Sequence, residues 1–299
     1  MRPNDWHLTA DVNDFLARAG DFLRSRPALH TMPLTVTEKY RREGVASRHG
    51  TATPVFGRLE RDGAVHAAFF QRTPAGSLSI TSVTREQADA LANRLAELDH
   101  PVPGVVGDHD SSTAFAGAWQ RRTGAEPVPT TRLHLYRLGT LTPPEPFPEG
   151  RGRVVDEKDR EQLIRFCREF CVEVGEQSSI DLIDAGSWAD SRFADRHFTF
   201  WETPDGTPVS MAASTSVVGG MIRVDPVYTP PHLRGRGYAA AVTVEASRAA
   251  PAGGAKEVVL FTDPGNPTSN ALYKRLGYVL LTDFTVYEFS YPAAGAGGS

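Results

Sequence analysis

The chain has 299 residues, of which 40% are hydrophobic and 23% are charged, and its formal net charge is −4. This composition is typical of a globular protein with one large domain or two ordinary ones. The negative charge argues against bulk binding to nucleic acid or to an anionic membrane surface. No apolar run approaches the roughly 20 residues of a membrane span, and the first residues lack the apolar core of a signal peptide, so we expect a cytoplasmic protein.

The first part of the chain alternates strand and helix patterns. They predict strands at 64–71 and 77–83, a helix at 84–98, a strand at 101–108, a helix within 111–125 and a strand within 130–138. The segment LTPPEPFPEGRGR, 141–153, then holds four prolines and two glycines, which interrupt both helix and sheet.

The proline-rich segment marks a domain boundary. We predict a first domain at 1–145, a linker at 146–152 and a second domain at 153–291. The Gly- and Ala-rich end, 292–299, is predicted to be a disordered tail.

The second part repeats the alternation more strongly. The patterns predict a short strand at 153–155, a helix at 158–174 capped by Asp156, a weaker helix at 185–195, strands at 197–203, 207–217 and 221–229, a helix from about 238, a strand at 256–263, a short helix within 266–277 and one or two strands at 278–291. This order predicts an α/β domain with a mixed sheet.

Cys167 and Cys171 are the only two cysteines and lie four residues apart on one predicted helix face. This spacing suits two buried thiols of a reducing compartment and does not suit a disulfide. No zinc or other metal is expected, because the nine histidines show no ligand-like spacing to each other or to the cysteines.

Two helix ends resemble each other. WQRRTGA at 119–125 and YKRLGYV at 273–279 share a basic pair, one intervening residue and a glycine. Because the elements around both stretches come in the same order, an internal repeat of two similar domains is predicted.

The stretch RGRGYAAAV, 234–242, lies between a predicted strand and a predicted helix. A glycine-rich turn that opens a helix binds anions through its backbone N–H groups and the helix dipole. Arg234 and Arg236 add positive charge beside Gly235 and Gly237. The alternative is an ordinary turn with two surface arginines, because the stretch lacks the complete phosphate-binding fingerprints of nucleotide-binding folds.

Three segments in order resemble the GNAT acetyltransferase superfamily. Arg234, Gly237 and Ala239 fit its R-x-x-G-x-A loop for the acyl-CoA pyrophosphate. PVYTPP, 226–231, resembles its splayed strand, and DPGNPTSNALYKRLGYV, 263–279, resembles its helix with asparagine and tyrosine. The resemblance covers about residues 152–291, and residues 1–145 resemble a second, degenerate copy.

The resemblance implies two GNAT-like domains, each a mixed, mostly antiparallel, twisted sheet flanked by helices. It implies a splayed strand pair for acyl-CoA in the second domain and acetyl-CoA as the co-substrate, without a metal. The residues expected to bind acetyl-CoA are Val227, Tyr228, Thr229, Arg234, Gly235, Arg236, Gly237, Tyr238, Ala239, Asn266, Asn270 and Tyr273. For Asn266 and Asn270, capping of the helix is an equal alternative.

Acetyl transfer to an amine needs a base for the amine, donors for the oxyanion and an acid for the departing thiolate. Backbone N–H groups around Val227 are candidate oxyanion donors. Tyr273 is the candidate acid, because a phenol with a pKa near 10 stays protonated at neutral pH; simple packing of its ring is the alternative.

Asp225 is the candidate base, because it shares a strand face with Val227; a solvated carboxylate beside Arg223 is the alternative. Glu173, Glu176 and Asp181 are candidate substrate-binding residues, since the family gathers its acceptor in that region. Their alternative is a solvated acidic face.

The predicted function is transfer of an acetyl group from acetyl-CoA to a primary amine of a small molecule or peptide through a ternary complex. The alternatives are a non-catalytic acyl-CoA sensor or interaction module, a longer acyl group and a hydroxyl acceptor. A monomer or homodimer is expected, with neither nucleic acid nor membrane as partner.

Only the second copy is predicted to bind acetyl-CoA. The corresponding turn of the first copy, TSVTREQAD at 81–89, contains no glycine, and Gln120 stands where Tyr273 stands in the second copy.

Overall fold

A computed structural model of the chain describes residues 6–44, 53–184 and 196–291. Its contacts divide the chain into two compact units, of which only the C-terminal one is continuous in sequence. The N-terminal unit comprises Met1–Leu135 with Leu281–Ser299, and the C-terminal unit comprises Tyr136–Leu280. This division differs from the predicted one, because the end of the chain is grouped with the N-terminal unit.

The N-terminal unit is built on a mixed, mostly antiparallel sheet in the order β1-β2-β3-β4-β5-β12. Only β4 and β5 pair in parallel. Its elements are β1 (Trp6–Thr9), α1 (Val12–Ser25), α2 (Thr31–Glu43), β2 (Val55–Arg61), β3 (Ala64–Gln71), β4 (Leu78–Ile80), α3 (Arg85–Glu97), β5 (Gly104–Asp108), α4 (His109–Thr123), most of β6 (Glu126–Leu138) and most of β12 (Tyr278–Ser290).

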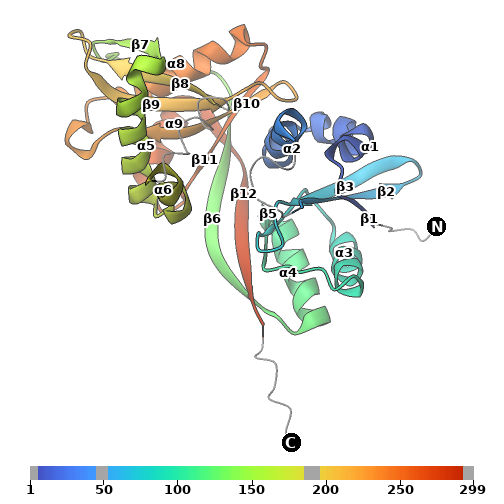
Figure 1. The fold of residues 1–299 in the computed structure, drawn as a ribbon. Coiled ribbons are helices and arrows are strands. Elements are labelled where there is room, and N and C mark those ends of the chain that lie inside the picture. The colour runs from blue at the N-terminus through green and yellow to red at the C-terminus, as the bar shows by residue number, and fades with distance from the viewer. Residues whose placement is uncertain (1–5, 45–52, 185–195, 292–299) are drawn as a thin grey trace, which may run out of the picture. The chain divides into compact units, whose positions relative to one another are not determined.

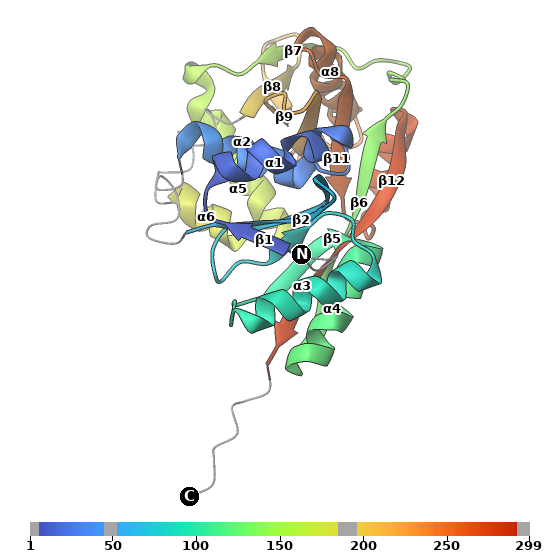
Figure 2. The ribbon, with the colours of Figure 1, turned by 90° about the vertical axis from the view of Figure 1, so that its right-hand side faces the viewer.

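Helices cover both faces of this sheet (Figures 1 and 2), with α1 and α2 on one face and α3 and α4 on the other. The core under α3 and α4 contains Phe69, Phe115 and Trp119. Phe289 of β12 joins this core and packs 6.2 Å from the Trp119 ring. The last strand therefore completes the N-terminal unit, where its residues 284–288 pair with β5.

The C-terminal unit repeats the same pairing pattern, in the order β11-β10-β9-β8-β7 with one parallel pair, β10 and β11. Its elements are β7 (Arg151–Val154), the 3-10 turn η2 (Glu157–Asp159), α5 (Arg160–Val174), α6 (Gln177–Asp184), β8 (Arg196–Glu202), β9 (Pro208–Thr215), β10 (Met221–Tyr228), the 3-10 turn η3 (Pro231–Leu233), α8 (Tyr238–Ala252), β11 (Glu257–Thr262) and α9 (Pro267–Arg275). This repeat confirms the prediction of two α/β domains, each with a mixed, mostly antiparallel sheet flanked by helices.

Successive side chains along the strands of the C-terminal sheet pack into two separate cores, one on each face of the sheet. Phe198 and Phe200 point toward α5 and α6, where they pack with both buried cysteines. Trp201 and Ala212 pack with α8 on the other face. Strand alternation thus places α5 and α8 on opposite faces of β8, β9 and β10.

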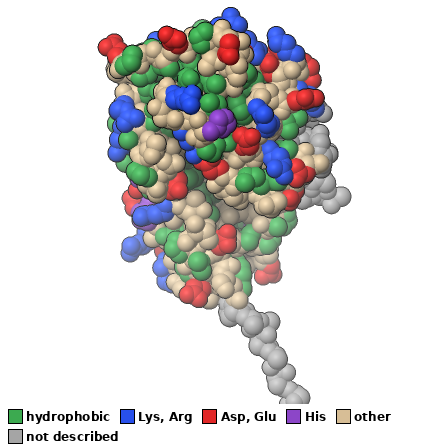
Figure 3. Space-filling model, turned by 90° about the vertical axis from the view of Figure 1, so that its left-hand side faces the viewer, with side chains coloured by type: hydrophobic (Ala, Val, Ile, Leu, Met, Phe, Trp, Pro, Cys, Tyr) green, Lys and Arg blue, Asp and Glu red, His purple; other side chains and the backbone are tan. Residues whose placement is uncertain are grey.

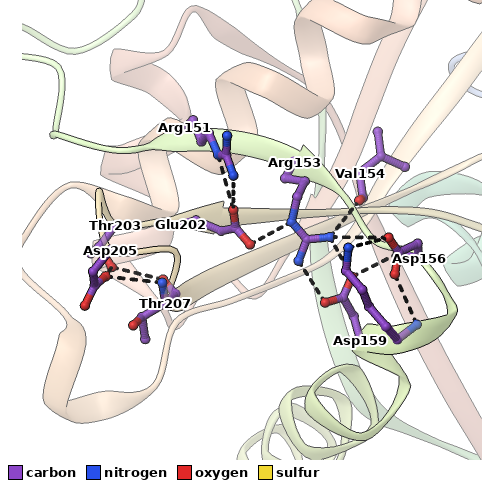
Figure 4. A network of polar contacts seen from close by, with 10 residues as sticks. Arg151, Arg153, Val154, Asp156, Asp159, Glu202, Thr203, Asp205 and Thr207 are labelled. Carbon is purple, nitrogen blue, oxygen red and sulfur yellow. Dashed lines mark hydrogen bonds and ion pairs between the residues drawn. The ribbon is translucent and has the colours of Figure 1, made fainter.

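Arg153 fixes the start of α5 to the sheet (Figure 4). Its guanidinium donates to Glu202 at 2.7 Å and bonds both oxygens of Asp159, at 2.6 and 2.8 Å. Glu202 is only 3% exposed, and a second arginine, Arg151, bonds it at 3.3 Å. The hydrogen bond from Arg153 holds the pKa of Asp159 below its ordinary value.

Most predicted elements of residues 64–138 and 151–291 are present, with shifted ends. The sequence analysis did not predict β1, α1, α2 and β2, nor the short helix α6, which stands where a loop was expected. The weak helix predicted at 185–195 and the tail at 292–299 lie outside the described residues. Among the residues that are described, no helix is long and apolar enough to cross a membrane.

Candidate active site

Strands β10 and β11 separate in the middle of the C-terminal sheet. They pair only at Met221–Arg223 with Glu257–Val259. Beyond this point β10 follows β9, with an irregularity between Val224 and Val227. The pairing of β10 with β11 therefore ends at Arg223 and Val259, before the Val224–Tyr228 part of β10. This is the splayed pair expected from the resemblance.

A glycine-rich loop follows β10 and opens α8. Gly235 and Gly237 have φ angles of +77° and +81°, which only glycine adopts readily. Gly237 is the N-cap of α8 and provides no side-chain acceptor. The first N–H groups of α8, from Tyr238 and Ala239 onward, thus lie at an exposed loop without a side-chain cap, an arrangement that binds anions.

The two arginines of this loop differ. Arg236 is exposed, and its only contact among the described residues is a long hydrogen bond of 3.5 Å to the carbonyl of His232. Arg234 donates to the carbonyl of Thr229 at 2.9 Å and forms an ion pair with Glu173. Arg236 is therefore available to an anion, whereas Arg234 ties the loop to α5 and to the end of β10.

Tyr273 of α9 lies in the core between α8 and the sheet and is 8% exposed. Its ring packs edge-on against Tyr278, with centroids 5.8 Å apart. Burial raises the pKa of Tyr273 above its ordinary value, and the charge of Asp225 adds to this effect. The phenol is thus fully protonated at neutral pH, as a proton donor must be.

Both asparagines form structural bonds within the unit. The side chain of Asn266 caps α9 by accepting from the N–H of Ser269 at 3.0 Å. Asn270 accepts from Thr262 at 2.7 Å and from Tyr136 at 3.1 Å. Its amide donates to two carbonyls, of residues 263 and 266. Asn266 is thus the cap of α9, whereas Asn270 anchors α9 to the end of β11; binding of CoA by either residue stays a prediction.

Asp225, the candidate base, is bound to an arginine. Arg196 donates to its carboxylate at 2.9 Å and also to its backbone carbonyl. Arg223 lies 4.0 Å from the same carboxylate oxygen. The carboxylate of Asp225 is thus held by Arg196, with Arg223 near the same oxygen, and its role as the base stays a prediction.

The three acidic candidates of the acceptor region lie on or beside α5 and α6. Glu173 reaches the loop through Arg234. Glu176 accepts from Ser179 at 2.8 Å, and Asp181 accepts from Gln177 at 2.8 Å. These last two make only short-range helix contacts among the described residues.

Sequence reasoning missed Glu169 of α5. Its carboxylate accepts a hydrogen bond of 3.0 Å from the hydroxyl of Tyr228, a residue expected to contact acetyl-CoA. Glu169 precedes Glu173 by one helical turn, so the i, i+4 spacing of two glutamates was a signal that could have drawn attention to it.

Comparison with known proteins agrees with this geometry. Residues 161–278 match the model of the acetyltransferase (GNAT) family. Comparison with curated proteins gave no match.

Solved structures are similar over nearly the whole chain. A GCN5-related N-acetyltransferase from Sphaerobacter thermophilus has 18% identity and a TM-score of 0.56, with 96% of each chain covered. A tandem GNAT protein from the clavulanic acid biosynthesis pathway has 11% identity and a TM-score of 0.53, with 99% of this chain and 100% of that chain covered. Such likeness concerns the fold. Residues 161–278 therefore belong to the GNAT acetyltransferase family, within a chain that has the fold of a tandem GNAT protein.

Proposed function

We propose that the C-terminal unit transfers an acetyl group from acetyl-CoA to a primary amine of a small molecule or peptide through a ternary complex. The observation that carries this proposal is the open N-terminus of α8 beside the splayed strand β10. The pyrophosphate of CoA would be bound by the first amides of α8 and by Arg236. The pantetheine arm would extend along β10 beyond Arg223, where its pairing with β11 ends.

The groups around this part of β10 suit acyl transfer. Backbone N–H groups near Val227 would stabilise the oxyanion of the tetrahedral intermediate. Tyr273 would give its proton to the departing thiolate, since the phenol is protonated at neutral pH. No metal is required for these steps.

The surface charge supports a small acceptor and not a nucleic acid. On the face drawn in Figure 3, acidic and basic side chains are interspersed and form no large basic patch. The net charge of −4 also disfavours bulk binding to a polyphosphate backbone. We further propose a cytoplasmic location and a monomer or homodimer.

Thiol release with acetyl-CoA and a panel of primary amines tests the proposal. We expect turnover with at least one amine and, by calorimetry, one acetyl-CoA per chain. Two molecules per chain would mean that the N-terminal unit also binds the cofactor. Tight binding of acetyl-CoA without thiol release for any amine or alcohol would contradict the proposed enzymatic activity and favour an acyl-CoA sensor. Thiol release with alcohols alone, or only with longer acyl groups, would change the proposed substrates.

A further inference from the structure

The end of β10 is joined to α5 by a hydrogen-bonded phenol. Tyr228 is the residue after Val227, and its ring packs edge-on against Phe166 and Phe170, with centroid distances of 5.9 and 6.4 Å. Its hydroxyl donates to Glu169 at 3.0 Å. The aromatic packing thus fixes where the Glu169 carboxylate stands, beside the strand that would hold the thioester.

Glu169 differs electrostatically from the other carboxylates near β10. Asp225 is bound to Arg196, and Glu173 is bound to Arg234. Among the described residues, Glu169 forms no ion pair, and Tyr228 is its one hydrogen-bond partner. Burial raises the pKa of Tyr228 to about 12, so this partner is a neutral donor. The half-buried Glu169 carboxylate therefore has a neutral hydrogen-bond donor as its partner and, among the described residues, no ion pair.

Glu169 and Tyr273 lie on opposite faces of β10. Tyr228 and α5 belong to one core of the C-terminal unit, whereas Tyr273 and α8 belong to the other. An attacking amine and a departing thiolate occupy different corners of a tetrahedral intermediate, so a base and an acid from opposite faces suit one displacement.

We propose that Glu169 binds the ammonium group of the acceptor and accepts its proton, with Tyr228 as the positioning residue. This inference rests on the proposed function. The proton passes from the ammonium nitrogen to the Glu169 carboxylate, and the neutral amine attacks the thioester carbon. The C–S bond breaks, and the sulfur takes the Tyr273 proton. Solvent then returns the proton of Glu169 to the Tyr273 phenolate, so protons and electrons balance.

The groups around Glu169 are consistent with this role. Tyr228 faces it from β10, and Glu173 follows one turn later on α5 with its charge bound to Arg234 of the loop. From α6, Asp184 is paired with Arg168, and Asp181 bonds Gln177. Glu169 is thus the carboxylate of this group that lies beside β10 and, among the described residues, forms no ion pair.

The test compares Glu169→Gln with the wild type in the full chain, and Glu161→Gln, an exposed change on the same helix, is the control. At pH 7 we expect kcat of Glu169→Gln to fall by roughly 100- to 10,000-fold, as for loss of a general base. The deficit should shrink by about tenfold for each pH unit toward the pKa of the amine, because a neutral amine needs no base. Unchanged kcat, or a deficit that does not vary with pH, would overturn the proposal.

A binding measurement separates this inference from the proposed function. Calorimetry with n-hexylammonium at pH 7, on the chain saturated with CoA, should show about tenfold or greater loss of affinity in Glu169→Gln. Equal affinities, or no binding to either protein, would overturn the ammonium site. A wild type that binds the probe through Glu169 but releases no thiol would contradict the proposed acetyltransferase and leave the ammonium site standing.

Discussion

The turns before α3 and α8 stand in the same order of elements: a strand, the turn, a helix and a parallel strand. They differ in whether side chains accept hydrogen bonds from the N–H groups at the start of the helix. Thr84 caps α3 by accepting from the N–H of Gln87 at 3.2 Å, and the Gln87 side chain accepts from the N–H of Thr84 at 2.9 Å. The N–H of Val83 donates to Ser111 at 2.9 Å. Before α8, glycines replace these side chains, and the cap is absent.

This difference teaches how one fold can bind an anion in one copy and not in the other. Before α3, the N–H groups of Val83, Thr84 and Gln87 already have side-chain acceptors, and an incoming phosphate would have to displace them. The amides at the start of α8 have none, so a phosphate oxygen would satisfy them. The prediction that only the C-terminal copy binds acetyl-CoA has this physical basis and stays a prediction.

The largest expected effect concerns the acid of the C-terminal unit. Tyr273→Phe preserves the ring and its packing, so acetyl-CoA affinity should hardly change. Turnover should fall roughly 100- to 10,000-fold, or about 3–5 kcal/mol of barrier, mainly in kcat. Tyr278→Phe is the matched control, because its hydroxyl bonds Ser247 inside the core. Equal kcat in Tyr273→Phe and wild type would assign Tyr273 to packing.

The second-largest expected effect is on the stability of the C-terminal unit alone. Arg153→Met leaves the buried Glu202 and Asp159 without their shared partner and should destabilise the C-terminal unit by about 3 kcal/mol at pH 7. Because the pKa of Asp159 is lowered in the folded chain, the pair stabilises above about pH 4 and loses this contribution as the pH falls further. In denaturant unfolding, the difference in the free energy of unfolding between Arg153→Met and the wild type should therefore become smaller at acid pH.

Lys158→Met serves as the control for that change, because its side chain is 74% exposed. Its free energy of unfolding should stay within about 1 kcal/mol of the wild type. A gap between Arg153→Met and wild type that is equally wide at pH 3 and pH 7 would contradict the role given to Asp159.

The third change places a negative charge beside the first N–H groups of α8. Ala239→Asp places a carboxylate in the first turn, which suits the helix dipole but repels phosphate. Acetyl-CoA affinity should fall about tenfold or more, whereas thermal stability should be kept. Ala239→Asn, of the same shape without the charge, is the control. Substitution of Gly237 is a poorer test, since its φ of +81° makes any side chain strained.

The smallest expected effect comes from removing the helix cap in the corresponding turn of the N-terminal unit. Thr84→Ala removes the cap of α3 and should cost about 1 kcal/mol of stability. Acetyl-CoA affinity and stoichiometry in calorimetry should stay those of the wild type, because the turn still lacks glycine. A weaker affinity in Thr84→Ala would show that this turn takes part in cofactor binding.

The sequence by itself determined the local features of this protein. The loop glycines, the helix they open and the short helix with Tyr273 are set by residues close together in the chain, because φ preference, capping and hydrophobic spacing act locally. Gly124 and Gly277, the shared residues of the two helix ends, both have positive φ, at +77° and +93°. The repeat of two α/β domains was therefore predictable from the order of such features.

Only the tertiary structure decided the partners of the charged side chains. Arg234 binds Glu173, 61 residues away in sequence, and Tyr228 donates a hydrogen bond to Glu169, 59 residues away. Asp225 meets its arginine over 29 residues. Sheet register and helix packing bring these groups together, and no local spacing encodes them. The same reason explains why the last strand, which follows α9 in sequence, pairs with β5 of the N-terminal unit.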